Sequence, residues 1–231
     1  MSETTPLLAL PLLAAAQAQK HVTHNEALTL LDAATQLAVL DRTRTTPPGA
    51  PVNGDRHLVA AGGSGDWAGH AGQIALYDGG WRFLVPRAGW RAFVAAERLS
   101  LIHDGTGWSD LMAGTASGGA AALRAVEEEL VLAGSFVAST IVIPNRAICL
   151  AVASRTVTAI TGATSYGVGI AGETTKFGGT LGIAAGASNV GAIGPQAFYA
   201  DTPLRVTAAG GSFTGGRVKL VLYTLVFNAP T

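Results

Sequence analysis

The amino-acid sequence predicts a mainly β protein that has an N-terminal α-helix, a small Trp-rich β-meander domain and a C-terminal β-sandwich of jelly-roll type. Glycine accounts for 30 of the 231 residues, about twice the usual share of ~7%. Gly-containing turn signals recur at short intervals after residue 50, and segments rich in Val, Ile and Thr lie between them. One long stretch, residues 14–40, has good helix formers and contains neither Gly nor Pro.

The predicted helix over residues 14–40 is apolar on two faces. Its apolar residues follow steps of three and four in two rows, Leu28, Leu31, Thr35 and Ala38 in one and Leu30, Ala33, Leu37 and Leu40 in the other. Such a helix is either enclosed within a domain or packed against copies of itself. The pair His21 and His24 has the spacing of two metal ligands, but no third ligand is evident, which favours a structural role. We therefore expect an oligomer seam formed by His21, His24, Leu28 and Leu31.

Residues 41–51 contain the sequence PPG and are interpreted as a linker that ends the helix. Residues 52–112 hold all four tryptophans and three Gly-rich turns, at 62–65, 78–80 and 104–107. The segments 73–77, 81–85 and 91–95 between the turns are typical of strands. We expect a compact β-meander here, whose small core depends on Trp burial.

Residues 113–122, AGTASGGAAA, are predicted to be a flexible linker, and residues 123–231 a β-sandwich. The expected strands of this sandwich are 129–132, 139–143, 147–152, 156–160, 204–208 and 217–227. The Gly-rich stretch 167–194 is predicted to form loops on its rim.

The composition excludes several classes of protein. Fifteen basic and fifteen acidic side chains give a formal net charge of zero, whereas a nucleic-acid binder needs a basic face. No apolar run approaches the ~20 residues of a membrane-spanning helix, so we expect no membrane insertion. Only 13% of the residues are charged, and a charge-poor surface favours a homo-oligomer. Cys149 is the only cysteine and lies in an apolar stretch, so we expect a buried thiol without a disulfide.

Residues 7–18, LLALPLLAAAQA, resemble the apolar core and the Ala-x-Ala ending of a secretory signal. The preceding residues 1–6 have an acidic side chain and no Lys or Arg, and two prolines interrupt the apolar run. We therefore expect residues 1–13 to be an apolar anchoring peptide that docks onto another protein. Its candidate contacts are Leu7, Leu8, Leu10, Leu12 and Leu13.

No motif predicts catalysis, a cofactor or a metal site. The sequence has no nucleophile elbow, no phosphate loop and no HExxH pattern. After residue 129 the only carboxylates are Glu173 and Asp201, which would form a glycosidase pair only within about 5–10 Å of each other. Aromatic side chains among planar polar ones suit sugars instead. The candidate glycan-binding residues are Tyr166, Glu173, Lys176, Asn189, Tyr199 and Asp201, whereas Phe177 and Phe198 are expected in the core.

The string AQAQKHVTHNEAL at residues 16–28 resembles the opening of an uncharacterised-domain family of tailed phages and alphaproteobacterial gene transfer agents. The segments GDR at 54–56, GDWAGH at 65–70 and PRAGW at 86–90 fit the same domain, so the resemblance covers roughly residues 5–112. The segments IPNRA at 143–147, GIAGE at 169–173 and FTGG at 213–216 are similar to the sandwich that often follows it.

This resemblance implies a head spike or tail fibre that binds host surface polysaccharide. Its other implied partners are capsid or tail proteins and further copies of the chain, as a trimer or a pentamer. It implies synthesis in the cytoplasm and release by lysis, and it supplies no catalytic residues. A purely architectural connector and a polysaccharide depolymerase stay open as alternatives. The choice between a head spike and a tail fibre and the identity of the sugar also stay open.

Overall fold

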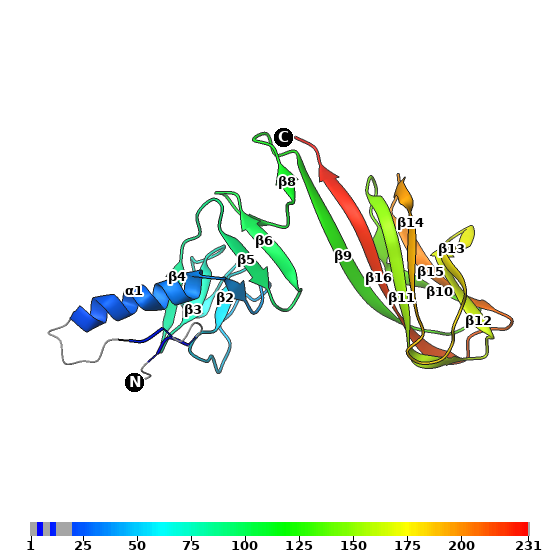
Figure 1. The fold of residues 1–231 in the computed structure, drawn as a ribbon, viewed down its shortest axis with the longest axis horizontal. Helices are drawn as coiled ribbons and strands as arrows, with labels where there is room; N and C mark the ends of the chain where they lie inside the picture. The colour runs from blue at the N-terminus through cyan, green and yellow to red at the C-terminus, as the bar shows by residue number, and fades with distance from the viewer. Residues whose placement is uncertain (1–3, 7–9, 13–19, 231) are drawn as a thin grey trace. The chain divides into compact units, whose positions relative to one another are not determined.

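The computed structural model describes residues 4–6, 10–12 and 20–230 of the chain, and it confirms a mainly β protein with an N-terminal helix (Figure 1). The chain divides into two compact units, Met1–Asp110 and Leu111–Thr231. Within the described part, no helix is both long enough and apolar enough to span a lipid bilayer.

The helix α1 spans Lys20–Ala34 and ends six residues before the predicted end. Gln36 takes a φ of 48°, which turns the chain out of the helix, and Ala38–Val39 form strand β1 instead. Leu37 and Val39 are buried in the core of the N-terminal unit. The prediction of helix to residue 40 is wrong because these apolar residues pack as a strand, which their spacing alone does not distinguish from a helix. Residues 13–19 of the predicted helix lie outside the described residues.

A buried arginine holds the C-terminal end of α1. Arg56 donates a hydrogen bond from Nη1 to the carbonyl oxygen of Ala33, 2.8 Å away. Burial lowers the pKa of Arg56, and the nearby carboxylate of Asp32 partly offsets this effect. A cation at this end of a helix is favourable because the last carbonyl groups lack partners within the helix.

The predicted β-meander of the N-terminal unit is divided between two small sheets. Strands β2 (Arg56–Leu58), β3 (Ile74–Tyr77) and β4 (Trp81–Leu84) form an antiparallel sheet. Strands β5 (Arg91–Val94), β6 (Leu99–His103) and β7 (Trp108–Ser109) form the other, and β1 joins it parallel to β5. Strands β2 to β4 and β5 to β7 each follow one another as in a meander, as predicted, and β1, which comes from the expected helix, adds a strand that is not next in sequence.

Tryptophan burial anchors this unit as predicted. The short 3₁₀ helix Gly65–Trp67 places the Trp67 ring in the core, where it is completely buried and packs edge-on against Trp81 at 5.1 Å. Trp108 is half-buried and donates its indole N–H to the carbonyl of Gly72 at 2.9 Å.

Residues 41–51 are not a free linker. The carbonyls of Asp41 and Arg44 accept hydrogen bonds from the backbone N–H groups of Leu58 and Ala60. This segment therefore belongs to the N-terminal unit.

The C-terminal unit begins with a hairpin where a flexible linker was expected. Strand β8 (Ala113–Gly114) pairs antiparallel with the first residues of β9 (Ala120–Val131). Backbone bonds from Thr115 and Gly118 close the turn between them. The linker prediction is wrong because alanines at 120–122 already belong to a long strand.

The remaining strands complete two antiparallel sheets in the order of a jelly roll (Figure 1). They are β10 (Phe136–Ile143), β11 (Ile148–Thr161), β12 (Ser165–Ile170), β13 (Glu173–Leu181), β14 (Ser188–Ala197), β15 (Thr202–Ala209) and β16 (Gly215–Asn228). One sheet has the order β10-β15-β12-β13 and the other β14-β11-β16-β9-β8. From β9 to β16, the first strand pairs with the eighth, the second with the seventh, the third with the sixth and the fourth with the fifth. This nested pairing is the jelly-roll arrangement.

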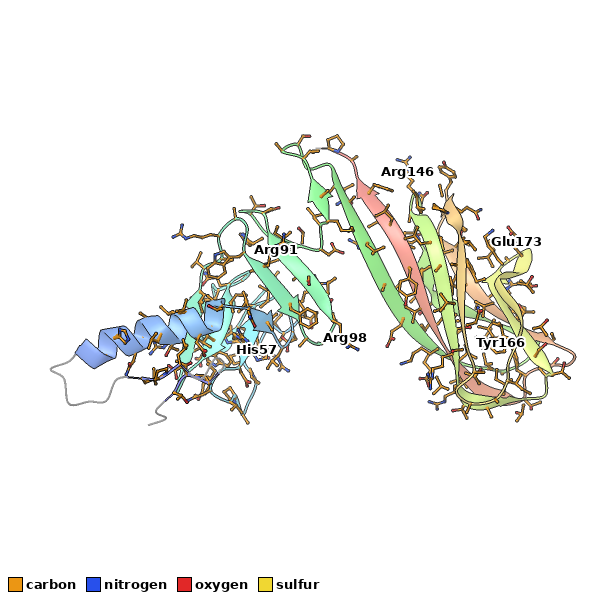
Figure 2. All side chains as sticks on the ribbon, viewed as in Figure 1. His57, Arg91, Arg98, Arg146, Tyr166 and Glu173 are labelled. Atoms are coloured by element: carbon orange, nitrogen blue, oxygen red, sulfur yellow. The ribbon has the colours of Figure 1, made fainter. Side chains whose placement is uncertain are left out.

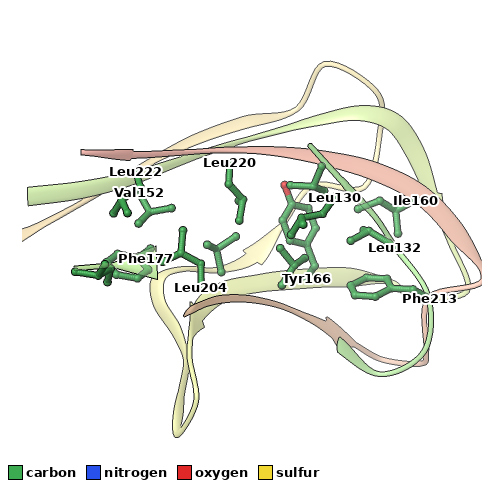
Figure 3. Close-up of a cluster of buried hydrophobic side chains, with 14 of the residues drawn as sticks. Leu130, Leu132, Val152, Ile160, Tyr166, Phe177, Leu204, Phe213, Leu220 and Leu222 are labelled. Atoms are coloured by element: carbon green, nitrogen blue, oxygen red, sulfur yellow. The ribbon is translucent and has the colours of Figure 1, made fainter. Parts of the chain in front are cut away.

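The core of the sandwich lies between the two sheets (Figure 3). Leu220, Leu222 and Val152 project from the five-stranded sheet toward Leu204 and Phe177 of the four-stranded sheet (Figure 3). The thiol of Cys149 is fully buried as predicted, and this desolvation raises its pKa to about 11.

The Gly-rich stretch 167–194 forms strands β12, β13 and β14 for most of its length, so the prediction of rim loops is wrong. Its glycines let backbones approach closely. A Cβ on Gly191 would collide with the backbone of Phe177, and one on Gly169 with the backbone of Glu173 and Thr174. Glycine is unfavourable in ordinary strands, which is why the sequence pattern indicates loops.

Candidate functional site

Tyr166 is part of the sandwich core and is removed from the predicted glycan site. Its side chain is 1% exposed, and its hydroxyl lies 3.3 Å from the Thr156 hydroxyl inside the sandwich. The residue lies on β12, where alternate side chains point to the core. Phe177 and Phe198 are buried as expected.

Glu173 and Lys176 lie together at the start of β13, and their side chains form an ion pair of 2.8 Å. The carboxylate of Glu173 is largely exposed, whereas the side chain of Lys176 is 10% exposed. Asn189 serves the fold, because its Nδ2 donates to the carbonyl of Phe177 at 2.8 Å and so joins β14 to β13. Of these three predicted residues, Glu173 offers the most open polar surface.

Tyr199 is the most exposed large aromatic side chain among the described residues, at 83%. It lies in the connection between β14 and β15, directly after the buried Phe198. The exposed phenol ring of Tyr199 is therefore held in place by the burial of the preceding residue, Phe198.

A second loop, residues 144–147 between β10 and β11, is bonded to the Tyr199 loop. Arg146 donates its backbone N–H to the carbonyl of Phe198 at 2.7 Å, and Phe198 donates to Ala147 at 3.0 Å. The backbone N–H of Asn145 donates to the Asp201 carboxylate at 2.8 Å. These three bonds make the two loops one structural element, which we call the Tyr199 loop pair (residues 144–147 and 198–201).

The side chains of Asn145 and Arg146 in the Tyr199 loop pair are exposed. Arg146 has a φ of 64°, a left-handed conformation that is uncommon for a residue with a Cβ. Sequence reasoning missed both residues. The sequence Pro144-Asn145 signals a turn, but nothing local indicates that this turn meets a loop more than fifty residues later in the chain.

Alternating strand directions bring a third element to the same end of the sandwich. The turn between β12 and β13, which carries Glu173, lies at the end where Arg146 lies (Figure 2). This end thus combines an exposed phenol ring, a guanidinium, an amide and carboxylates. An aromatic face with planar polar groups around it is suited to a shallow sugar site.

The two carboxylates of the glycosidase hypothesis have separate partners. Glu173 is ion-paired with Lys176, and Asp201 accepts the backbone N–H of Asn145. Among the described residues, no group of three His, Cys, Asp or Glu side chains is placed to hold a metal ion.

The described part of the predicted anchoring peptide folds back on itself. Thr5 donates its N–H to the carbonyl of Leu10 at 2.9 Å, and the Thr5 hydroxyl accepts the Leu10 N–H at 3.0 Å. Leu10 and Leu12 are half-buried. The other three candidates, Leu7, Leu8 and Leu13, lie outside the described residues, and anchoring stays a prediction.

The helix α1 has one face on the core of its unit and another face in solvent. Ala33 is completely buried, whereas Leu31 is 53% exposed. Leu28 is half-buried and His24 is exposed. The side chain of His21 lies outside the described residues, so the predicted oligomer seam is represented here by His24, Leu28 and Leu31.

Comparisons with known proteins give a family match and a likeness to a solved structure. Residues 24–109 match the family described as "Protein of unknown function (DUF2793)". This match lies within the stretch 5–112 that resembled an uncharacterised-domain family, and it covers 86 residues, all of them in the N-terminal unit. A solved structure of the "Cyanophage Pam1 capsid asymmetric unit" is similar with a TM-score of 0.38 and 18% identity, over 49% of this chain and 90% of that one. No curated protein matches the chain.

Proposed function

We propose that this chain is a structural protein of a phage-like particle, such as a gene transfer agent, and that it attaches the particle to host surface or capsular polysaccharide. It acts as a head spike or tail fibre and needs no catalytic residue. The observation that carries the attachment role is Tyr199, 83% exposed on a loop pair closed by three hydrogen bonds.

A rigid exposed aromatic ring suits a binding role better than a packing role. Ordering a loop on binding costs conformational entropy. In the Tyr199 loop pair, the hydrogen bonds of Phe198 and Asn145 already hold the two loops together, so this cost is small. The uncommon backbone conformation of Arg146 is of the kind that persists at ligand sites, where surrounding contacts hold it. The jelly roll is itself an architecture of viral capsid domains and of lectin domains.

The remaining partners follow from the same proposal. Copies of the chain form a homo-oligomer, a trimer or a pentamer, in agreement with a charged fraction of only 13%. The N-terminal peptide and α1 face capsid or tail proteins, and the particle is assembled in the cytoplasm and released by lysis. Several copies per particle convert weak single sugar sites into useful avidity.

Two alternatives make different predictions. A polysaccharide depolymerase would need Glu173 and Asp201 as a cooperating pair, and each of them is already engaged by another group. An architectural connector would need no sugar site, so replacement of Tyr199 would leave all its interactions unchanged.

The test is binding of the purified full-length chain to host cells with and without their capsule. We expect capsule-dependent binding that Tyr199→Ala weakens about fivefold per site, because losing an aromatic contact costs roughly 1 kcal/mol. Phe136→Ala is the matched control, since Phe136 is also an exposed aromatic (45%) but lies at the start of β10, at the opposite end of that strand from the loop 144–147. Equal binding to bare cells would contradict the polysaccharide proposal and favour the connector. Loss of polymer length on incubation would favour the depolymerase.

A further inference from the structure

The outer face of the five-stranded sheet carries an ordered apolar surface that the sugar proposal does not use. Side chains alternate along a strand, and Val152, Leu220 and Leu222 point to the core. Their neighbours therefore point outward, and the pairing register aligns them in rows across β9, β16 and β11. One row is Leu123, Leu225 and Ile148, and the next is Ala125, Tyr223 and Ala151.

These apolar side chains are accessible along several strands. Leu123 is 48% exposed and Phe227 52% exposed, and Val190 on β14 is 71% exposed. Four strands at ~4.8 Å and about eight residues at ~3.4 Å give a flat area of roughly 500 Å². Projecting side chains add accessible surface to this area, which brings it to the scale of the ~800 Å² that each partner buries in a stable interface.

One end of the same face is charged, with opposite signs on opposite sides. Glu127 and Glu129 lie on β9, whereas Lys219 and Arg217 lie on β16. Two ion pairs join these strands, Glu129–Arg217 at 3.2 Å and Glu127–Lys219 at 3.5 Å.

Arg155 on β11 is the unmatched charge of this face. It is exposed, and the pairing register places it directly beside Lys219, a group of the same sign. Like charges opposite each other on neighbouring strands are destabilising. Among the residues that the structure describes, no carboxylate is paired with Arg155. The face therefore has two glutamates on β9 at one side and, on β11 at the other side, an arginine without a carboxylate partner in the described part of the chain.

We propose that a second copy of this chain packs on this face. Arg155, Lys219 and Glu129 lie in one row across β11, β16 and β9. Consider a two-fold axis that runs parallel to β16 in the plane between two facing copies. Rotation about this axis reverses the order of the strands but keeps the position of each row along the strand direction. Glu129 of the second copy therefore meets Arg155 of the first. The same operation places Leu123 opposite Ile148 in the apolar row. The strands that flank β16 are thus complementary in both charge and apolarity, as an isologous interface requires. Lys219 on β16 itself meets its own copy, and its ion pair with Glu127 offsets that like charge. This two-fold contact is additional to the proposed trimer or pentamer, which would form through the predicted helix seam, and its surface is also separate from the Tyr199 loop pair.

The test measures self-association of the full-length chain by sedimentation equilibrium. Leu123→Asp places a charge in the apolar row, and we expect it to raise the dissociation constant at least tenfold. Val126→Asp is the matched control, because Val126 lies on the same strand at 41% exposure but points to the other side of the sheet. It is expected to leave association unchanged.

A second pair of variants tests the charge contact without touching apolar residues. Arg155→Glu places two carboxylates opposite each other and is expected to weaken association, whereas Arg155→Glu combined with Glu129→Arg restores the attraction and recovers it. The proposal is overturned if the wild-type chain is monomeric even at millimolar concentration. It is equally overturned if Leu123→Asp and Arg155→Glu leave association intact, which would assign it to the exposed face of α1, or if Val126→Asp disrupts it as strongly.

Discussion

Replacing Gly191 by alanine tests how the two sheets of the sandwich close at β13 and β14. An added Cβ would lie 2.6 Å from the carbonyl carbon of Phe177 and 2.8 Å from its Cα. Carbon atoms in contact are normally ~3.5–4.0 Å apart. The carbonyl oxygen of Phe177 would be the nearest atom of all, and every obstructing atom belongs to the backbone. No rotamer change therefore relieves the collision, and the two strands must separate by about 1.5 Å.

The cost of this separation has two parts. Overpacking of a filled site typically costs ~1–3 kcal/mol. Separation also weakens the 2.8 Å hydrogen bond from Asn189 to the Phe177 carbonyl, a contribution of about 1 kcal/mol. The lower backbone entropy of alanine returns ~0.5–1 kcal/mol. We therefore expect the free energy of unfolding to fall by about 1–3.5 kcal/mol.

The measurement is urea unfolding followed by far-UV circular dichroism. Gly194→Ala is the matched control, since Gly194 lies on the same strand and no atom would come within 4 Å of its new Cβ. We expect that control to be as stable as the parent or more stable by up to ~1 kcal/mol. Equal midpoints for the two variants would refute the close approach of β13 and β14.

Two further predictions concern the N-terminal unit. Arg56→Met removes the hydrogen bond to the Ala33 carbonyl and should lower the free energy of unfolding by about 1.5–3 kcal/mol, the range for a charged hydrogen bond. Trp fluorescence during urea unfolding measures this loss, since all four Trp lie in this unit. An unchanged urea midpoint would contradict the prediction. Asp104 accepts bonds from the Gly107 N–H, the Thr106 hydroxyl and the Thr106 N–H, which lower its pKa from 3.8 to about 2. This carboxylate therefore stabilises the fold above pH 3.8, and the contribution is lost as the pH falls through about 2. Asp104→Asn should flatten the acid side of the stability profile, and parallel profiles for the two proteins would count against the assignment.

The sequence predicts the jelly roll through strands that are rich in Val, Ile and Thr. It fails at β12, β13 and β14, where glycine replaces these residues because backbones pass too close for a Cβ. A signal was nevertheless present in residues 165–170, SYGVGI, where large apolar residues alternate with glycine. That period of two is typical of a strand buried on one face, and it would have placed Tyr166 in the core.

The exposure of the candidate residues is predicted correctly where it depends on local sequence and wrongly where it depends on tertiary contacts. Tyr199 follows a buried Phe and precedes the strand β15, so its exposure agrees with a short loop. The contribution of Arg146 depends on hydrogen bonds to a loop more than fifty residues away, and no periodic pattern encodes such a pairing. The end of α1 at Ala34 could not be predicted for the same reason. Ala38 and Val39 form a strand because they pair with β5, a segment distant in the sequence.

The two proposed surfaces of the sandwich are geometrically compatible. A two-fold axis along β16 preserves the direction of every strand, so both copies present the loop pair with Tyr199 at the same end. Two sugar sites would then face one cell surface, and binding of the first would raise the effective concentration of the second. Self-association and attachment are therefore coupled: Leu123→Asp should weaken binding to encapsulated cells although Leu123 touches no sugar. A monovalent oligosaccharide should bind that variant as well as it binds the parent, because the individual site is unchanged. Weaker oligosaccharide binding by Leu123→Asp would mean that the sheet face and the loop pair are one site and not two.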